Sequence, residues 1–474
     1  MGWNLAVWLG NGEFISCKDP RQAIDAEAGR QVQFSSLDDK RCIGINFKIK
    51  GSVGKRMKGI AGRRKTGKVL GGLLLAAVLA LPIQAGAAAQ AGSVYKIVAL
   101  GDSVTAGYEP AMAAQTNPTV YGYAERLKEQ ALFHGRAELV NDGILGLTSE
   151  GLANYTGAIE AGTAVAADAI QPGVSDPRIA KFASGIAQAK SDVADADLIV
   201  ITIGGNDIKP LLSEVKTLAA NDLETKVKTL LADYSANIIE TIGHLRTVNP
   251  QALIVLADQY QPVPAIAGKA DYDKLEQAAA LYTSTVDQVV AQTNTATGPV
   301  KVAHVAAAFV GSEMSYTHIL EGDIHPQQAG YEAIAKVFAG VIWGEYRQTA
   351  AAAGKEPISI VIGGQEWNSA NKPILKNGQT FVAIGDIVQA THAASKWNSK
   401  TSTVTVTLSG RTVVIPIGSS TIQVNGTKVA TSAPAFLNKV GVNSKTYVPL
   451  ALLANGLGFE VQYSPKMKTA FINF

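Results

Sequence analysis

The sequence predicts an α/β domain with a mainly parallel sheet, followed by a smaller α+β module. Between residues 94 and 343, short apolar runs of strand length alternate with longer stretches of helical periodicity. Strands that alternate with helices and are apolar on both faces are typical of parallel sheets covered by helices. After residue 343 the composition shifts, and the chain then repeats part of its own pattern. A chain of 474 residues is too long for one ordinary domain, which agrees with this division.

The segment from Met57 to Ala91 has the pattern of a secretory signal peptide. Five basic residues at 58–68 precede an apolar run at 69–83, and small residues with two A-x-A sites follow it. The run is short of the roughly 20 residues that a membrane span needs, so we expect no stable span after processing. We therefore predict a secreted or cell-surface bacterial protein. Residues 1–56 are interpreted as a mis-called extension ahead of the true start.

Charge and cysteine content exclude several classes of function. The whole chain has 42 Lys+Arg and 39 Asp+Glu. Residues 1–91 hold 14 of the basic and 6 of the acidic residues, which leaves 28 against 33, a net of −5, for the rest. That balance is not the footprint of a protein that binds nucleic acid. Both cysteines, Cys17 and Cys42, precede residue 57, so the mature protein is predicted to have no disulfide and no thiolate metal site.

The α/β domain is predicted to span residues 94–343. Its expected strands are the apolar runs at residues 96–100, 137–141, 197–203, 252–257 and 300–306. Helical periodicity lies between them, for example at 121–133 and 223–248. Ligands of such sheets bind beyond the carboxyl ends of the strands, and Ser103 directly follows the first strand. A serine at that place could start a helix as its N-cap or act as a nucleophile.

The C-terminal part is predicted to consist of a linker at 344–356 and an α+β module at 357–474. Residues 377–407 align without a gap with residues 443–473, at an offset of 66. Alternating apolar residues around Ser409-Gly410 are typical of a hairpin between the two copies. We interpret the module as two strand–helix–strand units packed together, because two copies are too few for a solenoid.

Four separated stretches place polar residues or glycines at the expected edge of the sheet. They are "GDS" with Ser103, "NDGILG" with Gly146, "IGGND" with Asn206 and "GDIHP" with His325. A serine hydroxyl attacks only when a base such as histidine takes its proton, and the resulting oxyanion needs N–H donors. The flanks of Ser103 are not G-x-S-x-G, so the nucleophile elbow of the α/β-hydrolases is absent.

In this order and spacing, the four stretches resemble the SGNH (GDSL-type) hydrolase family over residues 94–343. The resemblance implies a flavodoxin-like three-layer sandwich that hydrolyses ester bonds. It makes Ser103 the nucleophile and His325 the general base. It also implies an oxyanion hole formed by the backbone N–H of Ser103, by Gly146 and by Asn206.

The acid that orients His325 departs from the family pattern. The family usually has D-x-x-H, but Gly322 stands three residues before His325 here. Asp323, Glu321 or a backbone carbonyl could hold the imidazole instead. We favour Asp323 as the third catalytic residue. Activity is expected in each case, because this acid contributes orientation more than chemistry.

No metal and no cofactor are predicted. The other histidines are scattered, without an H-E-x-x-H motif or a carboxylate cluster: His134, His244, His304, His318 and His392. Residues 357–474 resemble the copper amine oxidase N-terminal-like domain, yet they offer no set of copper ligands. That resemblance implies a cell-surface or polymer-binding accessory, with a cell-wall polysaccharide as its possible partner. A spacer without a ligand is the alternative.

We therefore predict an exported serine esterase whose substrate is a carboxylic ester, either an acetyl group on a glycan or a short acyl lipid. A thioesterase or lysophospholipase of the same family is one alternative. A non-catalytic surface protein that binds glycans is another. Acyl-group selection is expected in loops such as 156–177.

Overall fold

The computed structural model describes residues 93–115, 117–431 and 433–473, and six short strands before them. The chain divides into two compact units, residues 1–86 and 87–474. In the first unit the described strands form three antiparallel pairs: β1 (Leu5–Leu9) with β2 (Glu13–Cys17), β3 (Ile24–Asp25) with β4 (Arg30–Gln31), and β5 (Phe34–Ser36) with β6 (Ile43–Ile45). The predicted signal peptide, residues 57–91, lies outside the described residues, as does Cys42.

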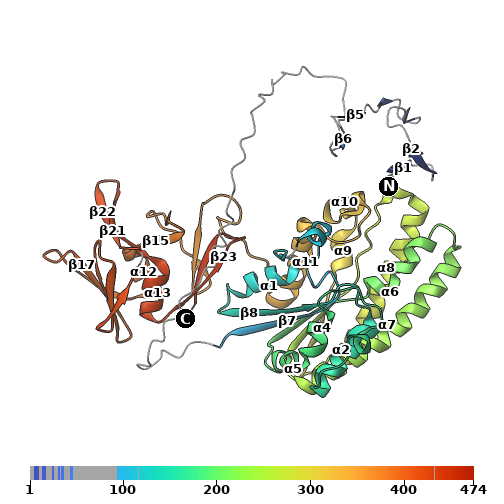
Figure 1. Ribbon diagram of the computed structural model, residues 1–474, viewed down its shortest axis with the longest axis horizontal. Coiled ribbons are helices and arrows are strands. Elements are labelled where there is room, and N and C mark those ends of the chain that lie inside the picture. The colour runs from blue at the N-terminus through green and yellow to red at the C-terminus, as the bar shows by residue number, and fades with distance from the viewer. Residues whose placement is uncertain are drawn as a thin grey trace. The chain divides into compact units, whose positions relative to one another are not determined.

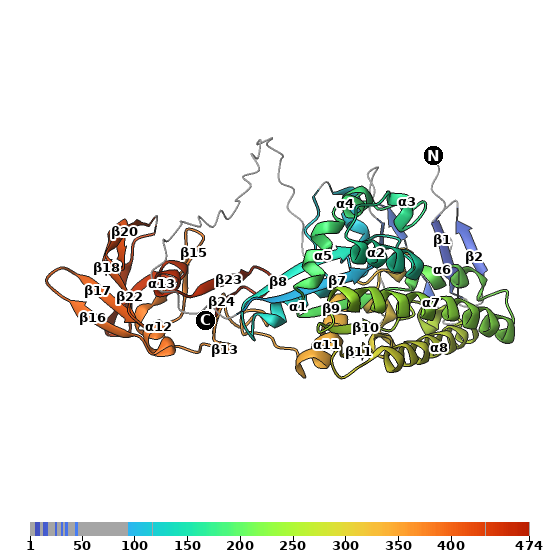
Figure 2. The same cartoon turned by 90° about the horizontal axis from the view of Figure 1, so that it is seen from below.

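A parallel five-stranded sheet is the centre of the described part of residues 94–343. Its strands are β7 (Tyr95–Gly101), β8 (Ala137–Gly143), β9 (Leu198–Thr202), β10 (Leu253–Ala257) and β11 (Val300–Ala303). They lie in the order β8-β7-β9-β10-β11, with every neighbouring pair parallel (Figure 2). Counted along the chain this order is 2-1-3-4-5, the flavodoxin order. The predicted α/β fold class is confirmed.

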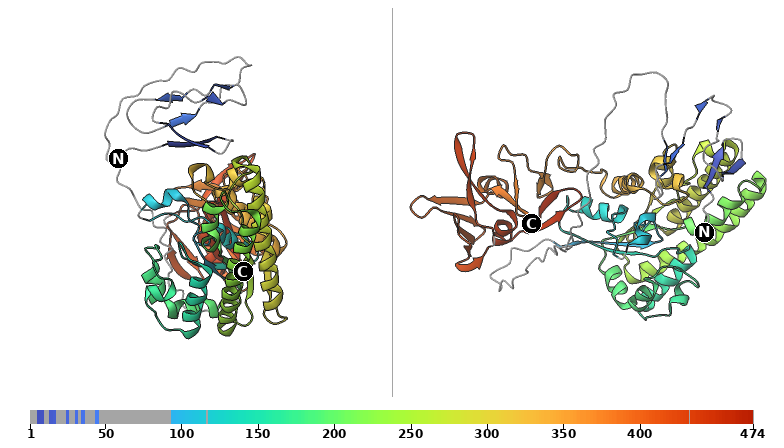
Figure 3. Two further views of the ribbon diagram at one scale, coloured as in Figure 1. Left: turned by 90° about the vertical axis from the view of Figure 1, so that its right-hand side faces the viewer. Right: turned by 45° about the horizontal axis from the view of Figure 1, so that its top comes forward.

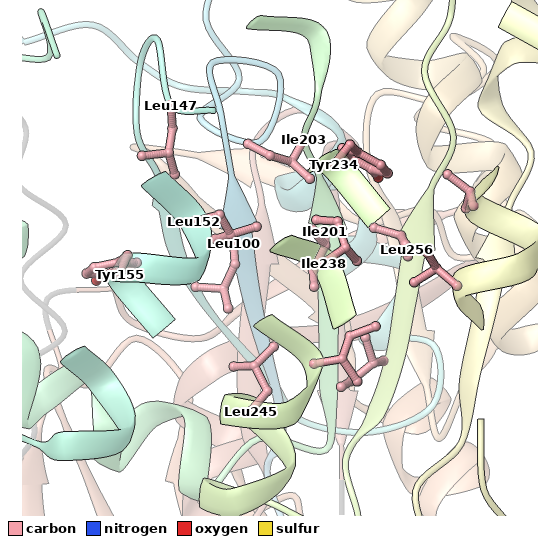
Figure 4. Close-up of a cluster of buried hydrophobic side chains, with 14 of the residues drawn as sticks. Leu100, Leu147, Leu152, Tyr155, Ile201, Ile203, Tyr234, Ile238, Leu245 and Leu256 are labelled. Atoms are coloured by element: carbon pink, nitrogen blue, oxygen red, sulfur yellow. The ribbon is translucent and has the colours of Figure 1, made fainter. Parts of the chain in front are cut away.

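The sheet is buried on both faces because alternate residues of each strand point to opposite sides. Val98 and Leu100 of β7 belong to the cluster packed against one layer of helices. Ile97 and Ala99 belong to the cluster on the other face. Figure 4 shows the first cluster, where Leu100, Ile201 and Leu256 from three strands meet side chains from the covering helices. The continuous apolar runs of strand length therefore correctly indicated a sheet that is covered on both faces.

Helices form the two outer layers (Figure 1). The first cluster is packed by α2 (Ser149–Ala161), α5 (Ile186–Ala194), α7 (Ala220–Val248) and α8 (Lys269–Thr293). The second is packed by α1 (Tyr123–Ala131), α9 (Val305–Phe309) and α11 (Gln328–Trp343). The other described helices of the domain are η1 (Pro110–Ala114), α3 (Ala167–Ile170), α4 (Ile179–Ser184), α6 (Gly205–Glu214), η2 (Ala265–Ala267), α10 (Glu313–Tyr316) and η3 (Ile319–Glu321).

The last predicted strand, 300–306, is too long. Strand β11 ends at Ala303, and α9 begins at Val305. The backbone N–H of Ala306 donates to the side chain of Asp258 at 2.8 Å, so it turns away from the sheet to a carboxylate at the end of β10. An apolar run that continues from a strand into a helix does not reveal where the change occurs.

The sheet has its topological switch point between β7 and β9. From β7 the chain goes to β8 on one side, and it then returns to β9 on the other. Loops that leave neighbouring strands in opposite directions open a crevice at their carboxyl ends, where ligands bind in such folds. Ser103 follows β7 and Asn206 follows β9, so both lie at this crevice.

The C-terminal module consists mainly of strands (Figure 3). Its described residues form three sheets, β13-β12-β24-β23, β14-β15-β22-β21 and β16-β17-β18-β19-β20. The bounds are β12 (Ser359–Ile362), β13 (Gln365–Glu366), β14 (Ile374–Lys376), β15 (Gln379–Ala383), β16 (Ala394–Asn398), β17 (Thr403–Leu408), β18 (Arg411–Pro416), β19 (Thr421–Val424), β20 (Thr427–Ala430), β21 (Phe436–Val440), β22 (Asn443–Pro449), β23 (Glu460–Ser464) and β24 (Thr469–Asn473). Its two helices are α12 (Ile384–Thr391) and α13 (Leu450–Leu457).

The internal repeat at an offset of 66 is visible in the secondary structure. Helix α12 and strand β16, moved by 66 residues, coincide with α13 and β23. Strands β15 and β22 pair antiparallel, and Val382 faces its own repeat equivalent, Val448. The two strand–helix–strand units therefore pack about a local two-fold relation. The predicted hairpin is also present, with β17 and β18 joined at Ser409-Gly410.

The module is in direct contact with the α/β domain. The side-chain amide of Gln462 bonds both the N–H and the C=O of Ala137, at 3.2 and 2.9 Å. Asn473 donates to the carbonyl of Gly135 at 2.7 Å. In the segment predicted as a linker, Thr349 and Ala351 are buried. In the part of the chain that the structure describes, no helix combines the length and the apolar character that crossing a membrane requires.

Candidate active site

Ser103 lies in a tight turn directly after β7. The turn is closed by Ala106, whose N–H donates to the carbonyl of Asp102, and by Val104, whose N–H donates to the Asp102 carboxylate at 2.9 Å. Residues 103–107 form turns and no helix starts there, so the possible N-cap role of Ser103 is not realised. Burial raises the pKa of Asp102 to about 7, and its carboxylate serves the turn rather than the imidazole.

His325 lies within hydrogen-bonding distance of both Ser103 and Asp323. Its Nε2 is 2.8 Å from the Oγ of Ser103, and its Nδ1 is 2.6 Å from an oxygen of Asp323. The same carboxylate oxygen accepts the backbone N–H of His325 at 2.8 Å. A carboxylate can only accept, so Nδ1 carries the proton and Nε2 is free to accept the serine hydroxyl. The structure thus brings together a hydroxyl, an imidazole and a carboxylate from segments 222 residues apart.

The loop before His325 explains how the departure from D-x-x-H is accommodated. Gly322 adopts a left-handed conformation, φ 78°, that ends η3 and turns the chain. Directly after this turn the N–H of Asp323 donates to the carbonyl of His318, and the N–H of His318 donates to the carbonyl of His325. The closed loop folds Asp323 back onto the imidazole. Glu321, the second candidate, is exposed and lies 3.3 Å from a ring nitrogen of His318 instead.

The charge state of His325 is set by its surroundings. Burial lowers the pKa of His325 below its ordinary value of 6.5, and the Asp323 carboxylate opposes this shift. Tyr108 covers the imidazole edge-on, with ring centroids 4.7 Å apart. A neutral imidazole at neutral pH is the form that can accept a proton.

The two predicted oxyanion donors other than Ser103 meet at one loop. Asn206 lies in the first turn of α6, and its side-chain amide donates to the carbonyl of Leu147 at 2.8 Å, one residue from Gly146. Within the described residues no acceptor is found for the backbone N–H groups of Ser103 and Gly146, or for the second amide hydrogen of Asn206. Three N–H donors from the loops after β7, β8 and β9 are therefore without a protein acceptor among the described residues.

The direction of Asn206 depends on Gly204. This residue is the N-cap of α6 with φ 111°, a conformation that side-chain-bearing residues rarely adopt. A Cβ at this position would lie 1.9 Å from the hydroxyl of Tyr282, which donates to the carbonyl of Ile203. Glycine therefore lets β9 turn sharply into α6 over a buried tyrosine.

The side chains that hold the Gly146 loop in place were not predicted from the sequence. The buried carboxylate of Asp176 accepts the N–H of Leu145 at 2.7 Å and forms an ion pair with Arg178. At the other end of the loop, the carboxylate of Asp207 accepts the N–H of Ser149 at 3.0 Å. Burial raises the pKa of Asp207. The only sign in the sequence that Asp207 holds this loop is that it directly follows Asn206. Nothing in the sequence pairs Asp176 with the loop.

The donor set of the C-terminal module does not fit copper. His392 is the single histidine of residues 357–474, and this segment has no cysteine. Copper sites in proteins are built from several imidazole or sulfur ligands. Within the described residues no group of three or more His, Cys, Asp or Glu side chains could hold a metal ion. No step of the chemistry below is routed through a metal.

Comparison with known proteins identifies similarities for both parts of the chain. Residues 99–333 match the GDSL-like lipase/acylhydrolase family, and residues 361–472 match the copper amine oxidase N-terminal domain. A lipase from a goat rumen metagenome is a similar solved structure, with 22% identity, 54% of this chain and 100% of that chain covered, and a TM-score of 0.36. An acetylxylan esterase from Geobacillus stearothermophilus shows 17% identity over 54% of this chain and 98% of its own, with a TM-score of 0.34. A carbohydrate esterase family 3 protein from Talaromyces cellulolyticus shows 14% identity over 52% and 96%, with a TM-score of 0.32. No curated protein matches the sequence.

Proposed function

Residues 99–333 belong to the GDSL-like lipase/acylhydrolase family and form an ester-hydrolysing domain, and we propose that this domain works through an acyl-enzyme on Ser103. The observation that carries the proposal is the chain of contacts from the Ser103 hydroxyl to His325 at 2.8 Å and from His325 to Asp323 at 2.6 Å. A serine nucleophile, a base and an acid that orients the base form the constellation used for acyl transfer on unrelated folds.

In the proposed reaction, His325 Nε2 takes the proton of the Ser103 hydroxyl while Oγ attacks the ester carbonyl. Asp323 holds Nδ1–H and stabilises the imidazolium. The N–H groups of Ser103, Gly146 and Asn206 stabilise the oxyanion, where each donor contributes on the order of 10²–10³ in rate. The intermediate then expels the alcohol, which takes the proton from His325. A water molecule activated in the same way hydrolyses the acyl-enzyme, releases the acid and restores the serine.

The acid side of the pH profile tests the role assigned to His325. Because burial lowers its pKa, kcat/KM for p-nitrophenyl acetate should be constant near neutral pH and fall with a midpoint below 6.5 on acidification. Asp102→Asn, which keeps an acceptor for Val104, should leave the midpoint unchanged. The assignment would be contradicted if kcat/KM did not fall on acidification before the protein unfolds. It would also be contradicted if the midpoint of that fall moved in Asp102→Asn.

Two other functions are compatible with the fold. A thioesterase or lysophospholipase would use the same catalytic groups, and it differs only in which acyl compound is accepted. A non-catalytic glycan-binding protein would have no use for a serine hydroxyl hydrogen-bonded to an oriented, half-buried imidazole. The geometry therefore favours an enzyme over the binding protein.

We propose that the enzyme is exported. The support is the sequence of residues 57–91. A basic segment is followed by an apolar run too short to span a membrane, and then by small residues. N-terminal sequencing of the protein recovered outside the cell should begin shortly after the A-x-A sites at 87–91. Recovery of a cytoplasmic chain that begins at Met1 would contradict export.

We further propose that the C-terminal module binds a cell-wall polysaccharide. Trp397 on β16 and Tyr463 on β23 occupy equivalent positions in the two repeats, and both rings are about half exposed, at 46% and 52%. Exposed aromatic rings offer apolar faces with a polar edge, which suits contact with sugars. The chain should be retained on insoluble peptidoglycan, and the double variant Trp397→Ala and Tyr463→Ala should elute while it still hydrolyses p-nitrophenyl acetate. A native chain that is not retained would leave the module as a spacer.

A further inference from the structure

We propose that the ester hydrolysed at Ser103 carries a fatty acyl chain, which enters an apolar channel between α6, α7 and α8. This inference rests on the proposed esterase function and names its substrate class. The three helices lie side by side in two views at right angles (Figures 1 and 2). They follow β9 and β10, and the cavity between them is lined in part by residues next in sequence to the catalytic ones.

The inner end of the channel is a cavity bounded by residues adjacent to the catalytic groups. Gly205, which precedes Asn206, forms one part of the wall, and Ile324, which precedes His325, forms another. Tyr260 is also part of the wall, and its hydroxyl donates to the carbonyl of Ile324 at 3.0 Å. In the proposed complex, the acyl chain of an ester whose carbonyl is held at Asn206 enters this cavity.

The wall of the cavity is apolar in its deeper part. Buried or half-buried side chains line it: Ile208, Leu211, Leu212, Leu223, Val227 and Leu275. Of the polar side chains in its wall, Lys209 is exposed to solvent, and the two glutamines are hydrogen-bonded to protein groups. The Gln261 amide donates to the carbonyl of Val263 and to Glu276, and the Gln259 amide donates to the carbonyl of Tyr260. A sugar hydroxyl would find few partners here, whereas a hydrocarbon chain would lose only contact with water.

A second, larger space shares part of its wall with the first. Leu223, Val227 and Ala278 line both the inner cavity and a groove between α7 and α8. The inner cavity has a volume of about 50 Å³ and the groove about 320 Å³. One water needs about 10–15 Å³ on this measure, so the inner cavity alone holds several atoms. An acetyl group would occupy little more than the opening, and a longer chain reaches the three shared side chains.

The proposed acyl-binding site does not lie in the loop that the sequence suggested for acyl selection. Acyl selection was expected in residues 156–177, but much of this segment is the end of α2 and the short helix α3. None of its residues lines the inner cavity. The residues of the channel come instead from α6, α7, α8, residues 259–262 and Ile324.

Isomeric esters test the proposal on the unmodified chain. Ethyl octanoate and octyl acetate have the same atoms but carry the long chain on the acyl and the alcohol side, respectively. Each methylene that leaves water is worth up to about a fourfold gain in kcat/KM. We expect ethyl octanoate to be hydrolysed at least about a hundredfold more efficiently than octyl acetate, and p-nitrophenyl octanoate more efficiently than p-nitrophenyl acetate.

A filled channel should remove the preference selectively. Ala278→Phe places a ring from a half-buried position into the space shared by cavity and groove. It should lower kcat/KM for ethyl octanoate by about tenfold or more and leave p-nitrophenyl acetate within about twofold. Ser284→Phe, on an exposed position of the same helix, is the matched control and should change neither.

The outcomes separate this inference from the esterase function. Equal rates for the two isomers, or a preference for octyl acetate, would overturn the acyl channel while the esterase stands. An octanoate preference that survives Ala278→Phe in a folded, acetate-active variant would also overturn it. A native chain that hydrolyses none of the esters would overturn the esterase function itself. Should Ala278→Phe fail to fold, the isomer comparison still decides.

Discussion

Replacing Ser103 with alanine is expected to lower kcat for p-nitrophenyl acetate by about five to six orders of magnitude, to the level left by the oxyanion donors and binding alone. The methyl group of alanine cannot attack the carbonyl, and no other described hydroxyl is found within hydrogen-bonding distance of the His325 Nε2. The measurement is steady-state hydrolysis at neutral pH with the native chain alongside.

The matched control for this variant is Ser213→Ala. Ser213 is an exposed serine of α6 whose hydroxyl donates to the carbonyl of Pro210, away from the imidazole. It should retain the native rate. Both variants should unfold at nearly the native temperature, because neither removes a group from the apolar core. A Ser103→Ala enzyme within about tenfold of the native rate would show that another group attacks the ester.

The second large effect is expected for Asp323→Asn, a loss of about 10³–10⁴ in kcat. The asparagine amide can donate to Nδ1 and so favours the tautomer that carries its proton on Nε2. In that tautomer the ring cannot accept the hydroxyl hydrogen of Ser103. The change is nearly isosteric, so the loop at Gly322 should keep its conformation.

Glu321→Gln is the matched comparison for Asp323→Asn. The Glu321 carboxylate contacts His318 from an exposed position and does not reach His325. Its replacement should change kcat by less than about threefold. A larger loss for Glu321→Gln than for Asp323→Asn would assign the orienting acid to Glu321 and would contradict the geometry.

The sequence was most informative where a pattern within one stretch of the chain decides the structure. The run at 96–100 predicted a buried strand, and the "GDS" after it placed Ser103 at the carboxyl edge, because parallel strands all end at the same side of a sheet. The repeat at an offset of 66 predicted two equivalent strand–helix–strand units, and α12 and α13 have equivalent bounds.

The sequence was least informative where a contact depends on chain geometry. The spacing of D-x-x-H did not identify the orienting acid, because the left-handed turn at Gly322 lets a carboxylate only two residues away fold back to the imidazole. The pairing of Asp176 with the Gly146 loop joins residues about 30 positions apart, and no local pattern reports it. The apolar run at 300–306 kept its character while the backbone changed from strand to helix.

Covalent labelling with a fluorophosphonate tests the nucleophile most directly, because the reagent reacts with a serine only when a base and an oxyanion site activate it. The folded native chain should take up one label, and peptide mass spectrometry should place it on Ser103, while Ser103→Ala takes up none. A folded, native chain that stays unlabelled, or a label on another serine with Ser103 unmodified, would contradict the account.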